Sequence, residues 1–166
     1  CLPPSGCCFK GRIWIAWSAV MDDDIAVMTA EQTEGGVQIR RVSRKGIDAF
    51  RPTIASGDKR LSLVWDQYRQ KKYEVCMADF EEAEWRAGKP MGKEGERWFC
   101  PDLVVDNNDQ AYLTWVVMKE VEDARGIVDH NTFAMLATCE KDGNPEIARD
   151  ASFPGNDRAI ADLREG

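Results

Sequence analysis

The chain has 166 residues, of which 43% are apolar and 31% charged, and its formal net charge is −7. The length is sufficient for one domain with its own core, and the composition is ordinary for a globular protein. The acidic balance disfavours nucleic acid and anionic membrane surfaces as partners. No apolar run is long enough to predict membrane insertion. The chain begins with Cys1 rather than Met, and no signal peptide follows, so we expect a processed product or a piece of a longer polypeptide.

A unit of 48–50 residues recurs along the chain. Three short runs end in tryptophan: IWIAW at 13–17, LSLVW at 61–65 and AYLTW at 111–115. A proline precedes each tryptophan by 13 or 14 residues: Pro4, Pro52 and Pro101. Such self-similarity is typical of repeat folds. It predicts a single domain whose repeat units span about 3–48, about 50–98 and about 99–150. Residues 151–166 would be a tail or the start of another unit.

The second unit shows the expected strands most clearly. A short run after Pro52 is followed by the turn GDKR, the run ending in Trp65, the turn RQKK and the run YEVCMAD at 73–79. The runs are short and rich in β-branched and aromatic residues, and polar turns bound them, as in strands of an antiparallel sheet. Both faces of each tryptophan-ended strand are apolar or small, so we expect these strands to be covered on both sides.

Four-stranded antiparallel units of this length, each packed between neighbours, predict an all-β fold made of β-propeller blades. A β-sandwich is the competing architecture, but it does not explain the recurring proline and tryptophan. Propellers have typically four to eight blades. We therefore expect an incomplete propeller whose outer faces are covered by missing blades of a longer protein. The alternative is a homo-oligomer, such as two chains that close a six-blade ring.

Two segments resemble blades of the sialidase-like (BNR) and TolB-like propellers: FRPTIASGDKRLSLVWDQYRQKKYEVCMA at 50–78 and CPDLVVDNNDQAYLTW at 100–115. The resemblance implies an extracytoplasmic location, either periplasmic or secreted. The sialidase Asp-box is absent at the corresponding turns. The Phe-Arg-Ile-Pro motif, whose arginine binds the substrate carboxylate, has only a partial counterpart in Phe50-Arg51-Pro52. The other arginines and the Tyr–Glu nucleophile pair of that family have no assignable counterparts.

The sequence offers few residues for chemistry. His130 is the single histidine, so a two-histidine metal site within the chain is excluded, and any Ser-His-Asp or Cys-His catalysis would use it. The six cysteines form no CxxC pair, and Cys76 and Cys139 stand in apolar runs typical of buried thiols. The segment 106–109 is oxygen-rich, which fits either a calcium site or a tight turn, and the turn is favoured. We expect no cofactor and no metal.

The topology of a propeller predicts which residues share a ligand-binding face. Loops between the second and third strands and links between blades lie on one face of such a fold. The candidate ligand-binding residues are Arg51, Asp66, Tyr68, Arg69, Asp102, Asp129 and His130. Their mixture of Tyr, Arg and Asp suits polar ligands. We hypothesise a module that binds a glycan or protein ligand through these loops. The alternative is part of a sialidase-like glycoside hydrolase.

Overall fold

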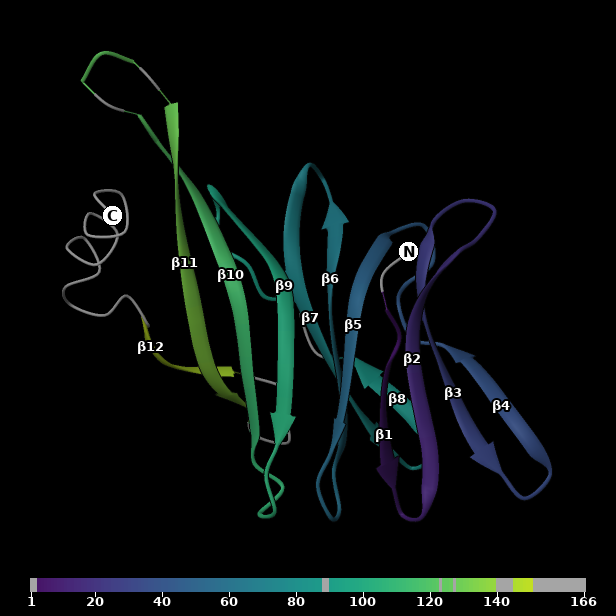
Figure 1. Cartoon of the computed structure of the whole chain (residues 1–166). Helices are drawn as coiled ribbons and strands as arrows, with labels where there is room; N and C mark the ends of the chain where they lie inside the picture. The colour runs from purple at the N-terminus through teal and green to yellow at the C-terminus, as the bar shows by residue number, and fades with distance from the viewer. Residues whose placement is uncertain (1–2, 88–89, 123, 127, 140–144, 151–166) are drawn as a thin grey trace.

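A computed structural model of the chain describes residues 3–87, 90–122, 124–126, 128–139 and 145–150. Within these residues the chain forms twelve strands in three four-stranded sheets (Figure 1). The described part of the chain contains no helix of the length and apolarity that a membrane crossing requires. Each sheet is an antiparallel meander whose strands pair in chain order.

We name the sheets A, B and C along the chain. Sheet A contains β1 (Ser5–Phe9), β2 (Arg12–Val20), β3 (Ile25–Thr33) and β4 (Gly36–Arg41). Sheet B contains β5 (Asp48–Ser56), β6 (Leu61–Arg69), β7 (Lys72–Glu81) and β8 (Glu84–Ala87). Sheet C contains β9 (Glu96–Val105), β10 (Ala111–Glu122), β11 (Val128–Cys139) and β12 (Pro145–Asp150). The predicted GDKR and RQKK turns connect β5 to β6 and β6 to β7.

The three sheets stack, and sheet B lies between the other two (Figure 1). One core fills the space between sheets A and B, around Trp14, Leu63 and Trp65. A second core fills the space between sheets B and C, around Val64 and Trp115. The first seven residues of β6 are all buried, which is the two-sided coverage that its apolar faces predict. Cys76 and Cys139 are buried free thiols in these cores.

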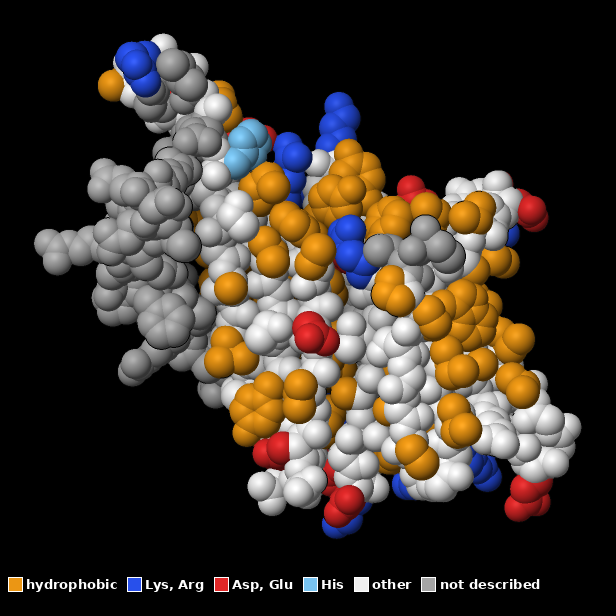
Figure 2. Space-filling view, in the orientation of Figure 1, with side chains coloured by type: hydrophobic (Ala, Val, Ile, Leu, Met, Phe, Trp, Pro, Cys, Tyr) orange, Lys and Arg blue, Asp and Glu red, His pale blue; other side chains and the backbone are white. Residues whose placement is uncertain are grey.

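The outer face of sheet A is exposed, as an incomplete propeller of stacked blades predicts, although the apolar pattern of its tryptophan-ended strand had predicted cover on both sides. Ile13 and Ile15 of β2 are 54% and 41% exposed, and Val37 and Ile39 of β4 are 69% and 59% exposed. The strand register places Ile15 and Ile39 across from Ala30, on one face. Figure 2 shows hydrophobic side chains gathered over this sheet, at the right of the view. The face is exposed because no described strand packs against it.

The recurring proline and tryptophan mark a β-bulge. In sheet B, Phe50 pairs with Asp66 and Thr53 with Val64, so that Arg51 and Pro52 together oppose the single residue Trp65. Two residues on one strand opposite one on its neighbour define a bulge. Proline is tolerated there because a bulge leaves backbone groups outside the ladder.

Sheet C repeats this bulge: Cys100 and Pro101 oppose Trp115. The residue before the proline has a positive φ in both sheets, 49° at Arg51 and 52° at Cys100. Residues other than glycine rarely adopt this left-handed backbone conformation. The bulge therefore redirects the side chain at this position in two successive sheets.

The two long edges of the stack carry different connections. The β2–β3, β6–β7 and β10–β11 turns lie at the edge that is uppermost in Figure 1, and the β1–β2, β5–β6 and β9–β10 turns lie at the opposite edge. We call these the upper and lower edges. The predicted candidate residues of the β6–β7 and β10–β11 regions thus belong to the upper edge.

Candidate ligand-binding site

The bulge of sheet B directs Arg51 towards Asp66. The guanidinium donates two parallel hydrogen bonds, from Nε to Oδ1 at 2.9 Å and from Nη2 to Oδ2. The Asp66 side chain is completely buried, whereas the Arg51 side chain is 32% exposed. This fork-to-fork geometry fixes the orientation of the guanidinium, and a charge-assisted pair of this kind is among the stronger protein hydrogen bonds.

Burial is the dominant electrostatic effect at this pair. It raises the pKa of the Asp66 carboxyl above its ordinary value, and the hydrogen bonds from Arg51 offset this only in part. For Arg51, burial lowers the pKa, but the hydrogen bonds to Asp66 and the attraction of its negative charge together outweigh burial and leave the pKa above its ordinary value. The carboxylate depends on Arg51 for its charge, because an unpaired buried carboxylate is strongly disfavoured.

Four aromatic rings form a cluster that begins beside this pair, where the guanidinium of Arg51 lies 5.9 Å from the centroid of the Phe50 ring. Tyr68 and Tyr73 lie opposite each other on β6 and β7, with ring centroids 5.0 Å apart. Tyr73 also contacts Phe50 and Phe99, with centroids 6.5 and 6.3 Å away. Phe50, Tyr73 and Phe99 are partly buried, whereas Tyr68 is 41% exposed. The cluster thus joins sheets B and C and presents one aromatic ring to solvent.

Comparison of the sheets shows that the charged pair is not required by the repeat. Cys100 occupies in sheet C the bulge position of Arg51. The residue after the tryptophan is Asp66 in sheet B, Val116 in sheet C and Ser18 in sheet A. Sheet C therefore forms the same bulge without an arginine and without a carboxylate. A costly buried ion pair that the fold does not need is a candidate functional feature.

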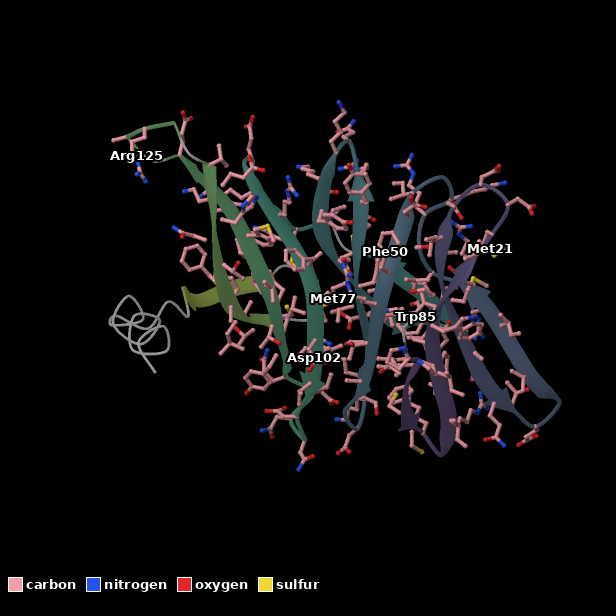
Figure 3. All side chains as sticks on the ribbon, turned by 45° about the horizontal axis from the view of Figure 1, so that its top comes forward. Met21, Phe50, Met77, Trp85, Asp102 and Arg125 are labelled. Carbon is pink, nitrogen blue, oxygen red and sulfur yellow. The ribbon has the colours of Figure 1, made fainter. Side chains whose placement is uncertain are left out.

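Arg69 and Asp102 lie on surfaces other than the one that holds the Arg51–Asp66 pair. Side chains alternate between the faces of a strand, so Arg69 projects from β6 on the face opposite Asp66, towards sheet A. There its Nε lies 3.2 Å from Oε2 of Glu74. Asp102 is exposed on sheet C, and its carboxylate accepts a hydrogen bond from the backbone N–H of Leu103. Figure 3 shows Asp102 well apart from Phe50.

His130 lies on the long β10–β11 hairpin, which extends beyond the other upper turns (Figure 1). Its side chain is 46% exposed, and Nε2 is 3.9 Å from Oε1 of Glu120. Glu120 also accepts a hydrogen bond from Arg97 at 2.9 Å. Arg125, at the tip of the hairpin, is far from Phe50 in Figure 3. Asp129 pairs with Val121 in the ladder, but its side chain lies outside the described residues.

The structure therefore brings three of the seven candidates together: Arg51, Asp66 and Tyr68. The sequence did not lead us to Tyr73 or to its contact with Phe99 of sheet C. The two-residue turn between Arg69 and Lys72 carried a usable signal, because such a turn places Tyr68 directly opposite Tyr73. The meeting with Phe99 depends on the packing of sheet B on sheet C, which no local pattern encodes. The binding roles of all seven candidates stay predictions.

The described residues contain no group of three or more His, Cys, Asp or Glu side chains arranged to hold a metal ion. The oxygen-rich segment 106–109 forms a turn. Oδ1 of Asp106 accepts hydrogen bonds from the backbone N–H groups of Asn108 and Gln110, each at 2.9 Å. Asp and Asn favour such turns because their side chains bond to nearby backbone groups.

Comparison with known proteins supports the architecture. No protein-family model matches the chain, and no curated protein matches it. A solved structure described as Bacteroides ovatus Xyloglucan PUL GH43B is similar, with a TM-score of 0.53, 12% sequence identity and 89% of this chain covered. The likeness covers 32% of that protein. It shows a propeller fold without distinguishing the BNR or TolB-like families. The chain is thus an all-β, incomplete β-propeller of stacked four-stranded blades.

Proposed function

We propose that the chain is a propeller module that binds a glycan at the upper edge, between sheets B and C. The observation that carries the proposal is the Arg51–Asp66 pair beside exposed Tyr68, placed where sheet C has only Cys100 and Val116. The glycoside hydrolase fold of the similar structure supports a glycan rather than a protein ligand, although this likeness concerns the fold alone. The binding residues are Arg51, Tyr68 and Tyr73.

The chemistry of these groups suits a sugar. The partly exposed ring of Tyr68 offers an apolar platform, and the ring of Tyr73 packs against it at a tilt of 50°. Arg51 uses Nε and Nη2 on Asp66, and no described residue accepts a hydrogen bond from its Nη1. That nitrogen is available to donate to a hydroxyl or carboxylate oxygen of a ligand. Asp66 acts as a positioning residue, because it holds the guanidinium in place.

A glycoside hydrolase is the alternative proposal, and the geometry favours it less. Hydrolysis of a glycosidic bond uses two carboxyl groups that flank the bond, one of which donates a proton. The carboxyl of Asp66 has a raised pKa, as a proton donor requires, but its side chain is completely buried and both oxygens bind Arg51. It cannot reach a substrate without disrupting that pair. An extracytoplasmic location accords with a glycan ligand and stays a prediction.

The test is a glycan array probed with the full chain, carrying neutral and acidic glycans that include xyloglucan oligosaccharides. We expect binding that Tyr68→Ala abolishes and that Tyr112→Ala leaves unchanged. Tyr112 is a matched control because it is 38% exposed but lies on sheet C, away from the site. Absence of binding to every glycan, or equal loss in both variants, would overturn the proposal. Turnover of fluorogenic glycosides by the wild-type chain would favour the hydrolase.

A further inference from the structure

A second recess lies between sheets A and B, on the other face of β6 from the proposed glycan site. It has a volume of about 300 Å³, near the lower limit for small-molecule sites. The connector from β4 to β5 supplies one wall, including Val42 and Arg44. Strand β6 supplies another, with Trp65, Gln67 and Arg69. The recess therefore combines apolar side chains, such as Val42 and Trp65, with polar ones, of which Arg44 and Arg69 are positively charged.

The charge of the recess is positive, although the protein as a whole is acidic. Arg44 and Arg69 line it, and none of the described lining residues is acidic. Arg44 is exposed, and no carboxylate of the described residues forms an ion pair with it. A guanidinium beside an apolar recess offers two parallel donors to a carboxylate. Arg44 is thus a free cation at this site.

Arg69 is held in place from outside the recess. It donates to Glu74 through Nε and Nη2, at 3.2 and 3.3 Å. Gln67 and Lys72 also bind Glu74, at 3.1 Å each. Burial raises the pKa of Glu74, but these hydrogen bonds outweigh it and leave the pKa below its ordinary value. Arg69, Lys72 and the amide of Gln67 therefore all bind the single carboxylate of Glu74. Two cations and one anion leave a net positive charge here, to which Arg44 adds another.

Trp65, which lines the same wall, contains a buried indole donor. Its side chain is 2% exposed, and its indole Nε1 has no hydrogen-bond partner in the described structure. A buried donor without a partner is costly, so a ligand oxygen that reached it would gain a favourable bond. Cys76, which also lines the recess, contributes no charge, because burial raises the pKa of its thiol to about 12.

We propose that this recess binds a small carboxylate ligand, with Arg44 and Arg69 on the carboxylate and the body of the ligand between sheets A and B. The carboxylate could belong to an acidic sugar or to a compact apolar acid, because the groups present recognise the carboxylate itself. The site is separate from the proposed glycan site, since Trp65, Gln67 and Arg69 project from the face of β6 opposite to Asp66 and Tyr68.

Isothermal titration of the full chain tests the proposal with two acids and their neutral analogues: glucuronate with glucose, and benzoate with benzyl alcohol. We expect at least one acid to bind and its neutral analogue not to bind. Arg44→Ala and Arg69→Ala should each weaken binding about tenfold, the effect of losing one charge-assisted contact. Arg44→Ala should not disturb folding, because the Arg44 side chain is exposed and pairs with no described carboxylate. A loss of binding in this variant therefore reports on the site itself.

Arg86→Ala is the matched control, since this arginine is also in sheet B but is 57% exposed and pairs with Glu82 near the lower edge. It should leave the affinity unchanged. Binding of glucuronate alone would assign the carboxylate to a sugar, and binding of benzoate alone would assign it to an apolar acid; both support the site. Equal binding of acid and neutral analogue, no binding of either acid at millimolar concentration, or equal effects of all three variants would overturn it.

Discussion

Gly57 of sheet B lies directly against the carboxylate of Asp109 in sheet C. A methyl group at residue 57 would meet Oδ1 of Asp109 and would lie 2.9 Å from the backbone oxygen of Asp106. The same Oδ1 accepts hydrogen bonds from the backbone N–H groups of Lys59 and Arg60, at 2.8 and 3.1 Å. The β9–β10 turn therefore caps the β5–β6 turn and fastens the two sheets at the lower edge.

Gly57→Ala tests this contact. The added methyl has no space unless the two turns separate, so we expect a loss of about 1–3 kcal/mol in the free energy of unfolding, as for other overpacked sites. Urea denaturation measures the change. Gly35→Ala in the β3–β4 turn is the control, because nothing lies within 4 Å of a methyl group there. Equal stability of the two variants would show that the turns do not touch in solution.

Arg51→Ala should make stability depend on pH. It leaves the buried Asp66 carboxyl without its partner, which costs about 3–5 kcal/mol when the group is ionised. The pKa of Asp66 is already raised, so its protonated form is favoured in the folded state. The loss should be smallest below the ordinary pKa of an aspartate and should grow as the pH rises through the folded-state pKa.

Unfolding free energies of the wild type and Arg51→Ala between pH 4 and pH 8 give this dependence. Adding Asp66→Asn to Arg51→Ala should remove it, because the asparagine does not ionise. A loss of constant size across the pH range would mean that Asp66 is not the group responsible.

Glu31 should behave in the opposite way. Its side chain is 5% exposed and pairs with Arg12 at 2.6 Å and Arg40 at 2.9 Å. Burial raises the pKa of this carboxyl, but the hydrogen bonds from Arg12 and Arg40 outweigh it, and the pKa is lowered. The stabilisation is thus present above the ordinary pKa of a glutamate and is lost as the pH falls through the folded-state pKa.

Glu31→Gln is therefore expected to cost about 1.5–3 kcal/mol at pH 7, the range for hydrogen bonds to charged groups. The difference from the wild type should shrink in acid. Glu34→Gln, in the exposed β3–β4 turn, controls for the charge change alone. A Glu31→Gln deficit that is as large in acid as at pH 7 would refute the assignment.

The exposed face of sheet A predicts association. In sheet B the equivalent residues, Leu61 and Leu63, pack against sheet A and are fully buried. Ile13 and Ile15 have no such cover, and exposed apolar faces of this kind promote association. We expect concentration-dependent self-association of the isolated chain in light scattering. Ile15→Lys should reduce it, whereas Val20→Lys, at the end of β2, should not. A chain that stays monomeric would contradict this expectation.

Much of the architecture could be predicted from the sequence, because the repeat is local and physical. Pro52 and Trp65 mark the bulge of sheet B, and Pro101 and Trp115 mark that of sheet C. Polar turns separate the strands, so the strands and their order follow from patterns along the chain. The exposure of Ile13 and Ile15 follows from an open stack of three blades, whereas the apolar pattern of this strand alone predicted cover on both faces.

The candidate site was predictable only where it is local. Arg51 and Asp66 lie across one hairpin, and the register that joins them is set by a short turn and a bulge. Arg69 was placed with them because it is close in sequence, but strand alternation puts it on the other face of sheet B. Asp102 was placed with them through its blade link, yet it lies on the outer face of sheet C. The position of Arg69 follows from alternation along a single strand and was readable from the sequence. The position of Asp102 depends on which face of sheet C packs against sheet B.

Nuclear magnetic resonance offers the most direct measurement of the central claim, that a glycan binds where sheets B and C meet beside Arg51. The ¹⁵N-labelled chain would be titrated with the strongest binder from the glycan array, and amide shifts would be followed. We predict that the largest shifts cluster at Arg51, Tyr68, Tyr73 and Phe99. Shifts centred on the lower-edge turns around Lys59 and Asn108, or no shifts at saturating ligand, would contradict the account.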